Sequence, residues 1–265
     1  MRIMGLFKKK PKPKVGGLAL SGGGARGYAH LGALKAFDEA GLHFNIIAGT
    51  SAGSIVGALY SAGAKIEDII DAAEVLDPKE IRTGPLFIPS PAQKIEDVMR
   101  RYLGNMTFDK LTKKFACVAV DLIEAKQVVL SEGVIARAVS ASCAVPGVFR
   151  PVVIDGRHLV DGGVLNTIPS DVVRMMGADV VIAVDVNPTR GFGTSSLGML
   201  DVLQACLRIL TAQNAALGIA AADILVSAPL REFSASKKDG YLEMMEVGYN
   251  AAKTMIPNIK SALAL

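Results

Sequence analysis

The sequence has few of the side chains on which disulfide frameworks and aromatic clusters depend. Its 265 residues include no tryptophan, 5% aromatic residues, three cysteines and three histidines. The cysteines, Cys117, Cys143 and Cys206, are odd in number and form no C-x-x-C pair. This pattern argues against a disulfide framework and indicates reduced, mostly buried thiols, as expected of a cytoplasmic protein.

The chain also lacks a convincing transmembrane or secretory segment. Residues 40–64 carry no formal charge, and a membrane-spanning helix needs about 20 mostly apolar residues. However, this run contains five glycines and polar side chains such as Asn45 and Thr50, so a buried strand, a turn and a buried helix explain it better. No apolar stretch follows the basic N-terminus, which argues against a secretory signal.

Positive charge is concentrated in the first fourteen residues. They contain six basic residues and no acidic one, whereas the whole chain has a net charge of +4, so the remainder is near neutral at −2. A near-neutral body argues against a nucleic-acid-binding protein. We expect residues 1–14 to form a flexible basic tail, either simply solvated or weakly attracted to anionic lipid headgroups at the inner membrane face. Residues 15–265 show no repeat or linker and are expected to form one domain.

Predicted strands and helices alternate along the chain. Strands are expected at 15–20, 45–48, 115–120, 127–130, 152–154, 159–160, 178–186 and 224–226. Helices are expected at 28–40, 55–62, 66–76, 92–103, 134–140, 169–176, 197–220 and 241–265, the last with a stop near Pro257. Because several strands are continuous apolar runs, the pattern predicts an α/β protein with a mainly parallel sheet covered on both faces.

A glycine-rich loop follows the first predicted strand. Gly22, Gly24 and Gly27 satisfy the G-x-G-x-x-G pattern of dinucleotide-binding sites. Such a site also needs an acidic residue at the end of the second strand, and none is there, so a dinucleotide site is disfavoured. The amides of Gly22, Gly23 and Gly24 could instead form an anion site, which beside a nucleophile becomes an oxyanion hole. A tight packing turn is the alternative.

Arg26 lies in the first turn of the following helix, where a cation interacts unfavourably with the helix dipole. Its presence predicts a carboxylate or phosphate partner, although a surface ion pair would also explain it. Arg26 therefore joins the glycine loop as a supporting residue of the candidate site.

The segment GTSAGS, residues 49–54, has the form of a nucleophile elbow, G-x-S-x-G, with a strand before it and a helix after it. This predicts Ser51 as a nucleophile; a buried serine that caps the helix is the alternative. An elbow serine usually passes its proton to a histidine that comes late in the chain. His30, His43 and His158 are better explained as structural residues, and the 107 residues after His158 contain no histidine.

A carboxylate is the remaining candidate for the base. Asp161 ends a short predicted strand and is followed by two glycines, in the sequence HLVDGG. Apolar neighbours would partly desolvate the carboxylate, which raises its pKa and makes it a better base. D-G-G is also a common turn sequence, so the residues alone favour neither a catalytic base nor an ordinary turn residue at Asp161.

Four motifs occur in order within residues 15–190: SGGGARGYAHLG, GTSAGS, ASCAVPGVFRPV and VDGGVLNTIP. Together they resemble the patatin-like phospholipases, in particular short prokaryotic members similar to the catalytic domain of neuropathy target esterase. The resemblance implies a three-layer α/β/α fold with Ser51 as nucleophile and Asp161 as base of a Ser–Asp dyad without histidine. It also implies no metal or other cofactor, and an oxyanion hole supplied by Gly22, Gly23 and Gly24 with Arg26 beside them.

The resemblance further implies a serine acyl hydrolase that cleaves carboxylic esters of lipids, of the phospholipase A or lysophospholipase type. An acyltransferase or thioesterase with the same dyad, and a non-catalytic lipid-binding protein, are the alternatives. The expected partner is a phospholipid or lysophospholipid. The sequence predicts neither its head group nor the oligomeric state of the protein.

Two further segments bear on a lipid substrate. The segment ASCAVPGVFRP places Ser142, Val145 and Phe149 where they could line an acyl pocket or simply pack on the core. The segment TGPLFIPSPAQ, residues 83–93, carries apolar side chains between prolines and is a candidate lid or interface-contacting loop over a lipid site. A packed surface loop is the alternative.

Overall fold

The computed structural model describes residues 12–76, 89–187, 198–235 and 238–265. Most of the predicted basic tail and the apolar part of the candidate lid therefore lie outside the described residues. The strands are β1 (Gly16–Leu20), β2 (Ile46–Thr50), β3 (Lys114–Asp121), β4 (Lys126–Leu130), β5 (Val152–Ile154), β6 (Arg157–Asp161), β7 (Val180–Asp185) and β8 (Ile224–Ser227). The α-helices are α1 (Tyr28–Glu39), α2 (Ala52–Ser61), α3 (Ile66–Val75), α5 (Gln93–Leu103), α6 (Ile135–Ser142), α7 (Ser170–Met175), α8 (Met199–Ala221) and α9 (Tyr241–Leu263), with 3₁₀ helices η1 (Gly24–Gly27), η2 (Phe108–Lys110) and η3 (Gly162–Val164).

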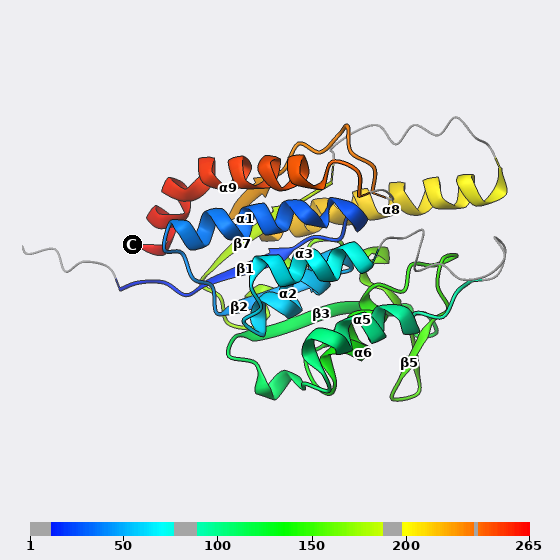
Figure 1. Ribbon diagram of the computed structural model, residues 1–265. Helices are drawn as coiled ribbons and strands as arrows, with labels where there is room; N and C mark the ends of the chain where they lie inside the picture. The colour runs from blue at the N-terminus through cyan, green and yellow to red at the C-terminus, as the bar shows by residue number, and fades with distance from the viewer. Residues whose placement is uncertain (1–11, 77–88, 188–197, 236–237) are drawn as a thin grey trace, which may run out of the picture.

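The described strands form one sheet in the order β5-β6-β3-β2-β1-β7-β8, with β4 also paired to β3. Neighbours from β3 through β2, β1 and β7 to β8 are parallel, whereas β4, β5 and β6 pair antiparallel. Helices α7 and α8 pack on one face of the sheet. The other α-helices lie on the opposite face, among them α1, α2 and α9 (Figure 1). The predicted three-layer α/β/α fold with a mainly parallel sheet is confirmed.

Each central strand places alternate side chains in two separate cores. Leu18 and Leu20 of β1 point into the larger core, whereas Ala19 between them points into a smaller one with Val172 of α7 and Ala215 of α8. Both faces of the strand are therefore apolar, which explains why the strand sequences show no polar alternation.

The predicted helix stop near Pro257 is wrong, because α9 continues through this residue to Leu263. Helix α9 lies alongside α1 (Figure 1), and Ala252 and Ile259, on either side of the proline, are fully buried. Packing on α1 and the core therefore stabilises the helix although Pro257 cannot donate a backbone hydrogen bond.

None of the described helices is both long enough and apolar enough to span a membrane. The uncharged run over residues 40–64 is instead divided between a turn, β2 and α2. Strand β2 is buried between the two cores, and α2 packs in the larger one. The strand–turn–helix prediction for this run is confirmed.

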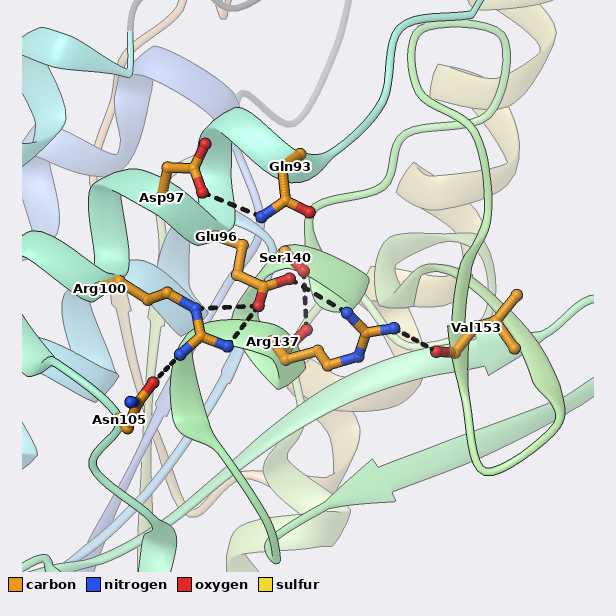
Figure 2. A network of polar contacts seen from close by, with 8 residues as sticks. All are labelled: Gln93, Glu96, Asp97, Arg100, Asn105, Arg137, Ser140 and Val153. Atoms are coloured by element: carbon orange, nitrogen blue, oxygen red, sulfur yellow. Dashed lines mark hydrogen bonds and ion pairs between the residues drawn. The ribbon is translucent and has the colours of Figure 1, made fainter.

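A buried glutamate links α5, α6 and β5, as Figure 2 shows. Glu96 accepts hydrogen bonds from Arg100 Nη2 at 2.6 Å and from Arg137 Nη1 at 3.3 Å. Arg137 also donates to the Val153 carbonyl oxygen at 2.8 Å, and Arg100 contacts Asn105. The network fixes the position of α6, whose last residue contacts the turn that carries Ser51.

We expect replacement of Glu96 by alanine to lower the free energy of unfolding by about 1–3 kcal/mol, because one substitution removes both charge-assisted links. The arginine side chains are 34% and 45% exposed, so water can solvate them and the cost stays below that of a fully buried pair. Asp97→Ala, which removes the exposed neighbouring acid bonded to Gln93, is the matched control and should change stability by less than about 0.5 kcal/mol. Urea denaturation measures both, and equal effects would contradict the expectation.

Candidate active site

Ser51 lies on a sharp turn between β2 and α2. Its backbone has φ 51° and ψ −122°, a region that residues other than glycine rarely adopt. Two flanking glycines permit this turn. A Cβ on Gly49 would lie 2.3 Å from the Gly53 carbonyl oxygen, and a Cβ on Gly53 would lie 2.2 Å from the Leu20 carbonyl oxygen. The segment has the geometry of a nucleophile elbow, in which a strained strand-to-helix turn presents the serine hydroxyl.

The backbone amide of Ser51 is held by a second segment. It donates a hydrogen bond of 3.0 Å to Ser142 Oγ, which in turn donates one of 2.6 Å to the Val118 carbonyl oxygen. Ser142 ends α6 and is fully buried, so it is not part of the acyl pocket that its segment was expected to line. Its hydroxyl instead connects the elbow to α6 and β3, a role that the sequence did not indicate.

We expect Ser142→Ala to lower the free energy of unfolding by about 1–3 kcal/mol, because the Ser51 amide and the Val118 carbonyl oxygen would each lose a buried partner. Ser140→Ala is the matched control, since that buried hydroxyl donates only to the Arg137 carbonyl oxygen of its own helix. Urea denaturation should show the larger loss for Ser142→Ala. A larger loss for Ser140→Ala would contradict the role given to Ser142.

Asp161 reaches Ser51 because β2 and β6 approach each other along the same edge of β3. Thr50, the last residue of β2, pairs with Val118, and Asp161, the last residue of β6, pairs with Ala119. Strand β4 occupies the opposite edge of β3 at both positions. Since β2 is parallel to β3 and β6 is antiparallel to it, the two strands end facing each other, which brings Asp161 to the turn that follows Thr50.

The Asp161 side chain is almost completely buried beside the serine, with the residue 6% exposed. Burial raises its pKa to about 6, while hydrogen bonds from the Ser51 hydroxyl and the Gly163 amide act in the opposite direction. The Gly163 amide donates to Asp161 Oδ1 at 2.7 Å and fixes the carboxyl group at the start of η3. The site therefore holds a carboxylate of near-neutral pKa against a serine hydroxyl, as general-base chemistry requires.

The glycine loop packs against the elbow, but one of its amides is already occupied. The Gly22 amide donates a hydrogen bond of 3.0 Å to the Thr167 carbonyl oxygen. This corrects the prediction that Gly22 supplies an oxyanion amide and leaves Gly23 and Gly24 as candidates. Gly24 has φ +59°, and a Cβ there would lie 2.3 Å from the Ala235 carbonyl oxygen, so the loop conformation requires glycine at this position.

Arg26 is buried beneath this loop rather than exposed on the surface. Its Nε donates a hydrogen bond of 2.9 Å to the Phe233 carbonyl oxygen. Burial raises the pKa of Asp185 on β7, and hydrogen bonds from Asn187 together with the charge of Arg26 oppose that rise. Arg26 therefore donates to a backbone carbonyl oxygen, and its charge acts to lower the pKa of an internal carboxyl group.

The three histidines occupy structural positions. His30 is fully buried, and its Nε2 donates a hydrogen bond of 2.9 Å to the Ser21 carbonyl oxygen, directly before the glycine loop. Burial lowers the pKa of His30 to about 4, so it stays neutral and anchors the loop. His43 and His158 are exposed, and none of the three lies among the described residues that line the cavity at Ser51.

Ser51 and Asp161 border a cavity of about 390 Å³. Its lining is largely apolar and comes from helices on both faces of the sheet, including Leu31, Ile55, Leu76, Ile95, Leu207 and Ala215. Val145 and Phe149 also line it, as the acyl-pocket interpretation predicts. An apolar cavity with a few polar groups at one place suits an acyl chain whose ester carbonyl lies at the serine.

A second side chain with a nucleophilic atom, Cys143, lines the cavity with its Sγ 3.7 Å from Ser54 Oγ. Burial raises the pKa of its thiol, with a contribution from the charge of Asp161, so the thiol stays protonated and is a poor nucleophile. Cys117 is also buried, whereas Cys206 is exposed. Within the described part of the chain, no three histidine, cysteine, aspartate or glutamate side chains gather to hold a metal ion.

Sequence comparison finds similar proteins over most of the motif-bearing region. The family model of patatin-like phospholipases matches residues 18–174. An uncharacterised NTE family protein of Mycobacterium tuberculosis is 38% identical over 184 residues, which cover 66% of this chain and 49% of that protein. Lysophospholipase nte1 of Aspergillus fumigatus is 32% identical over 203 residues, 70% of this chain and 13% of that protein. The chain thus spans about half the length of this mycobacterial relative and about a third of the length of another NTE family protein from the same organism.

Structural comparison extends the likeness to nearly the whole chain. The crystal structure of VipD from Legionella pneumophila has a TM-score of 0.60 and 15% sequence identity, and the match covers 94% of this chain and 68% of that one. At this identity the match establishes a common fold, which includes the part of the chain after residue 174.

Proposed function

The chain belongs to the patatin-like phospholipase family, and from that premise we propose that it is a serine acyl hydrolase that cleaves carboxylic esters of lipids. The observation that carries the proposal is that Ser51, on its strained turn, and the buried Asp161 carboxylate line the same apolar cavity. A phospholipid or lysophospholipid is the proposed substrate, of the phospholipase A or lysophospholipase type.

In the proposed mechanism Ser51 Oγ attacks the ester carbonyl carbon while Asp161 accepts the hydroxyl proton. The carbonyl oxygen becomes an oxyanion, which the amides of Gly23 and Gly24 stabilise. The tetrahedral intermediate expels the alcohol, which takes the proton from Asp161 and leaves an acyl group on Ser51. Asp161 then accepts a proton from water, the hydroxide attacks the acyl-enzyme, and the fatty acid leaves as Ser51 regains its proton.

The experiment that tests this function compares the protein with its Ser51→Ala variant on a panel of phospholipids, lysophospholipids and acylglycerols. Release of fatty acid by the parent protein but not by the variant supports the proposal. Addition of glycerol or coenzyme A as acyl acceptor separates hydrolysis from transfer, and an acyl-coenzyme A substrate tests thioester cleavage. Absence of turnover on every ester would favour a non-catalytic lipid-binding protein.

The pKa of Asp161 predicts the pH dependence of the reaction. Below pH 6 the carboxyl group is protonated and cannot accept the Ser51 proton, so kcat/KM should fall about tenfold for each unit of pH below that value. Above pH 6 it should reach a plateau. A short-chain monomeric ester should be used so that lipid aggregation does not change with pH. A profile centred near pH 4, the ordinary value for an aspartate, would show that burial does not raise the pKa of Asp161.

A further inference from the structure

We propose that this protein docks on a lipid surface through an apolar patch of α8 and the β3–β4 turn, at the end of the molecule where the cavity lies. The proposal rests on the proposed lipid hydrolysis for its purpose, but the binding step can be measured without turnover. We call this surface the docking patch and define it by Val202, Ile209, Leu210, Leu122 and Ile123.

The first observation is that the exposed side of α8 is apolar. Ile209 is 55% exposed, Leu210 57% and Leu217 71%. The other described exposed side chains on the helix are Val202, Cys206, Ala212, Gln213, Ala216 and Ala220. Gln213 is the only polar side chain among them, and no charged residue occurs between Ile209 and Ala222. A helix face that meets water normally carries charged residues, so this face is suited to an apolar environment.

A separate element, the β3–β4 turn, also exposes large apolar side chains. Leu122 and Ile123 lie in the β3–β4 turn, where polar residues and glycine are usual, and they are 54% and 71% exposed. The Asp121 carboxylate accepts hydrogen bonds from the amides of Ile123 and Glu124, at 3.0 and 3.2 Å. These hydrogen bonds fix the backbone conformation of the turn, and in this conformation two large aliphatic side chains are exposed to solvent.

Both elements lie at the end of the sheet that carries Ser51. Because β3 is parallel to β2, the turn after β3 and the elbow after β2 lie at the same end of the sheet, where the parallel strands have their carboxyl ends. Helix α8 is the next described element after β7, another parallel strand, and its N-terminal half extends beyond the sheet (Figure 1).

Helix α8 also connects the docking patch to the cavity. Leu207, Thr211 and Ala215 line the cavity from one side of the helix. Ala212 both lines the cavity and is exposed, so the outer apolar face of α8 is continuous with the cavity wall at this residue. An acyl chain that enters from a surface in contact with α8 would meet apolar side chains along the way.

A lipid surface is the partner that these features fit. The five side chains of the docking patch are aliphatic and come from two elements at the end of the sheet that holds the candidate site, and α8 joins the patch to a cavity suited to acyl chains. A lipid surface offers a broad apolar boundary and the proposed substrate at the same place. A second copy of the chain on the same patch would cover the exposed rim at Ala212, and the experiment distinguishes this outcome.

The test is binding to phosphatidylcholine vesicles, measured by flotation with the Ser51→Ala protein so that no lipid is consumed. Zwitterionic vesicles keep the basic N-terminal residues from dominating binding. The double variant Ile209→Gln/Leu210→Gln should bind at least about tenfold more weakly, because it removes two large apolar contacts without lowering helix propensity. The matched control is Val15→Gln/Met175→Gln. These two residues are 47% and 69% exposed and lie at the opposite end of the sheet. The control variant should bind vesicles as the parent protein does.

In the active protein, the docking variant should lose activity on vesicles and keep its kcat/KM on a monomeric short-chain ester. Circular dichroism and thermal unfolding confirm that both double variants are folded. Unchanged vesicle binding by the docking variant would overturn the proposal, and sedimentation that shows loss of a dimer in that variant alone would assign the patch to a second copy. If the parent binds vesicles but hydrolyses no ester, the proposed function fails and the docking patch stands.

Discussion

Replacement of Ser51 by alanine is expected to lower ester hydrolysis by on the order of 10⁴-fold or more and to abolish covalent labelling by a fluorophosphonate. The hydroxyl is the only group of this residue that takes part in the proposed chemistry. The fold should persist, because the contact with Ser142 uses the Ser51 backbone amide, which alanine retains. Hydrolysis of a short-chain ester and mass spectrometry of the labelled protein measure the two effects.

Ser54→Ala is the matched control for this variant. Ser54 lies three residues further on, and its hydroxyl donates to the Ser51 carbonyl oxygen at 2.6 Å rather than lining the cavity. This variant should retain fluorophosphonate labelling at Ser51. Labelling that survives in Ser51→Ala would identify another nucleophile and remove the basis of the proposed mechanism.

The local features of the site were predictable because short stretches of backbone determine them. A turn with the geometry at Ser51 needs small residues on either side, and Gly49 and Gly53 approach other backbone atoms too closely for any side chain. The G-x-S-x-G pattern therefore contains the small residues that the turn requires. The α/β/α fold was predictable for a similar reason, since strands buried on both faces have few polar residues.

The features that sequence reasoning missed depend on contacts between distant segments. The Gly22 amide is occupied by the Thr167 carbonyl oxygen, and the Ser51 amide is held by Ser142. The stop predicted at Pro257 failed because packing of α9 overrides the local effect of proline. Such partners can be found only when the chain pairing is known.

The approach of Asp161 to Ser51 is the most informative of these long-range features. The sequence left Asp161 evenly balanced between a base and an ordinary turn residue. The structure explains the contact through one antiparallel strand, β6, that continues along the edge of β3 where β2 ends. In a purely parallel sheet no strand could run toward the end of β2 in this way, so the mixed pairing is what makes a histidine-free Ser–Asp contact possible.

Replacement of Asp161 by asparagine is expected to lower kcat by about 10³-fold or more, because asparagine cannot accept the Ser51 proton at neutral pH. The side chain has nearly the same shape, and its oxygen can still accept the Gly163 amide hydrogen bond. Steady-state kinetics on a short-chain ester, with labelling by a fluorophosphonate, measure the loss. Activity within tenfold of the parent would exclude Asp161 as the base.

The same substitution should stabilise the fold at neutral pH. The rise of the Asp161 pKa from 3.8 to about 6 means that ionisation costs the folded state about 3 kcal/mol at pH 7.5. The protonated side chain carries no such cost, so the penalty is absent below pH 4 and grows as the pH rises toward 6. Asp161→Asn should therefore raise the free energy of unfolding by about 1–3 kcal/mol at pH 7.5 and by much less at pH 4.5.

Urea denaturation of both proteins at pH 7.5 and pH 4.5 tests this expectation. An aspartate that serves only as a turn residue would stabilise the fold through its hydrogen bonds, and its replacement would lower stability at neutral pH. A buried carboxylate kept for proton transfer behaves in the opposite way, because its charge is unfavourable in the folded state and favourable for the reaction. A gain in stability together with a loss of turnover would therefore distinguish the base from the turn residue, which the sequence alone could not do.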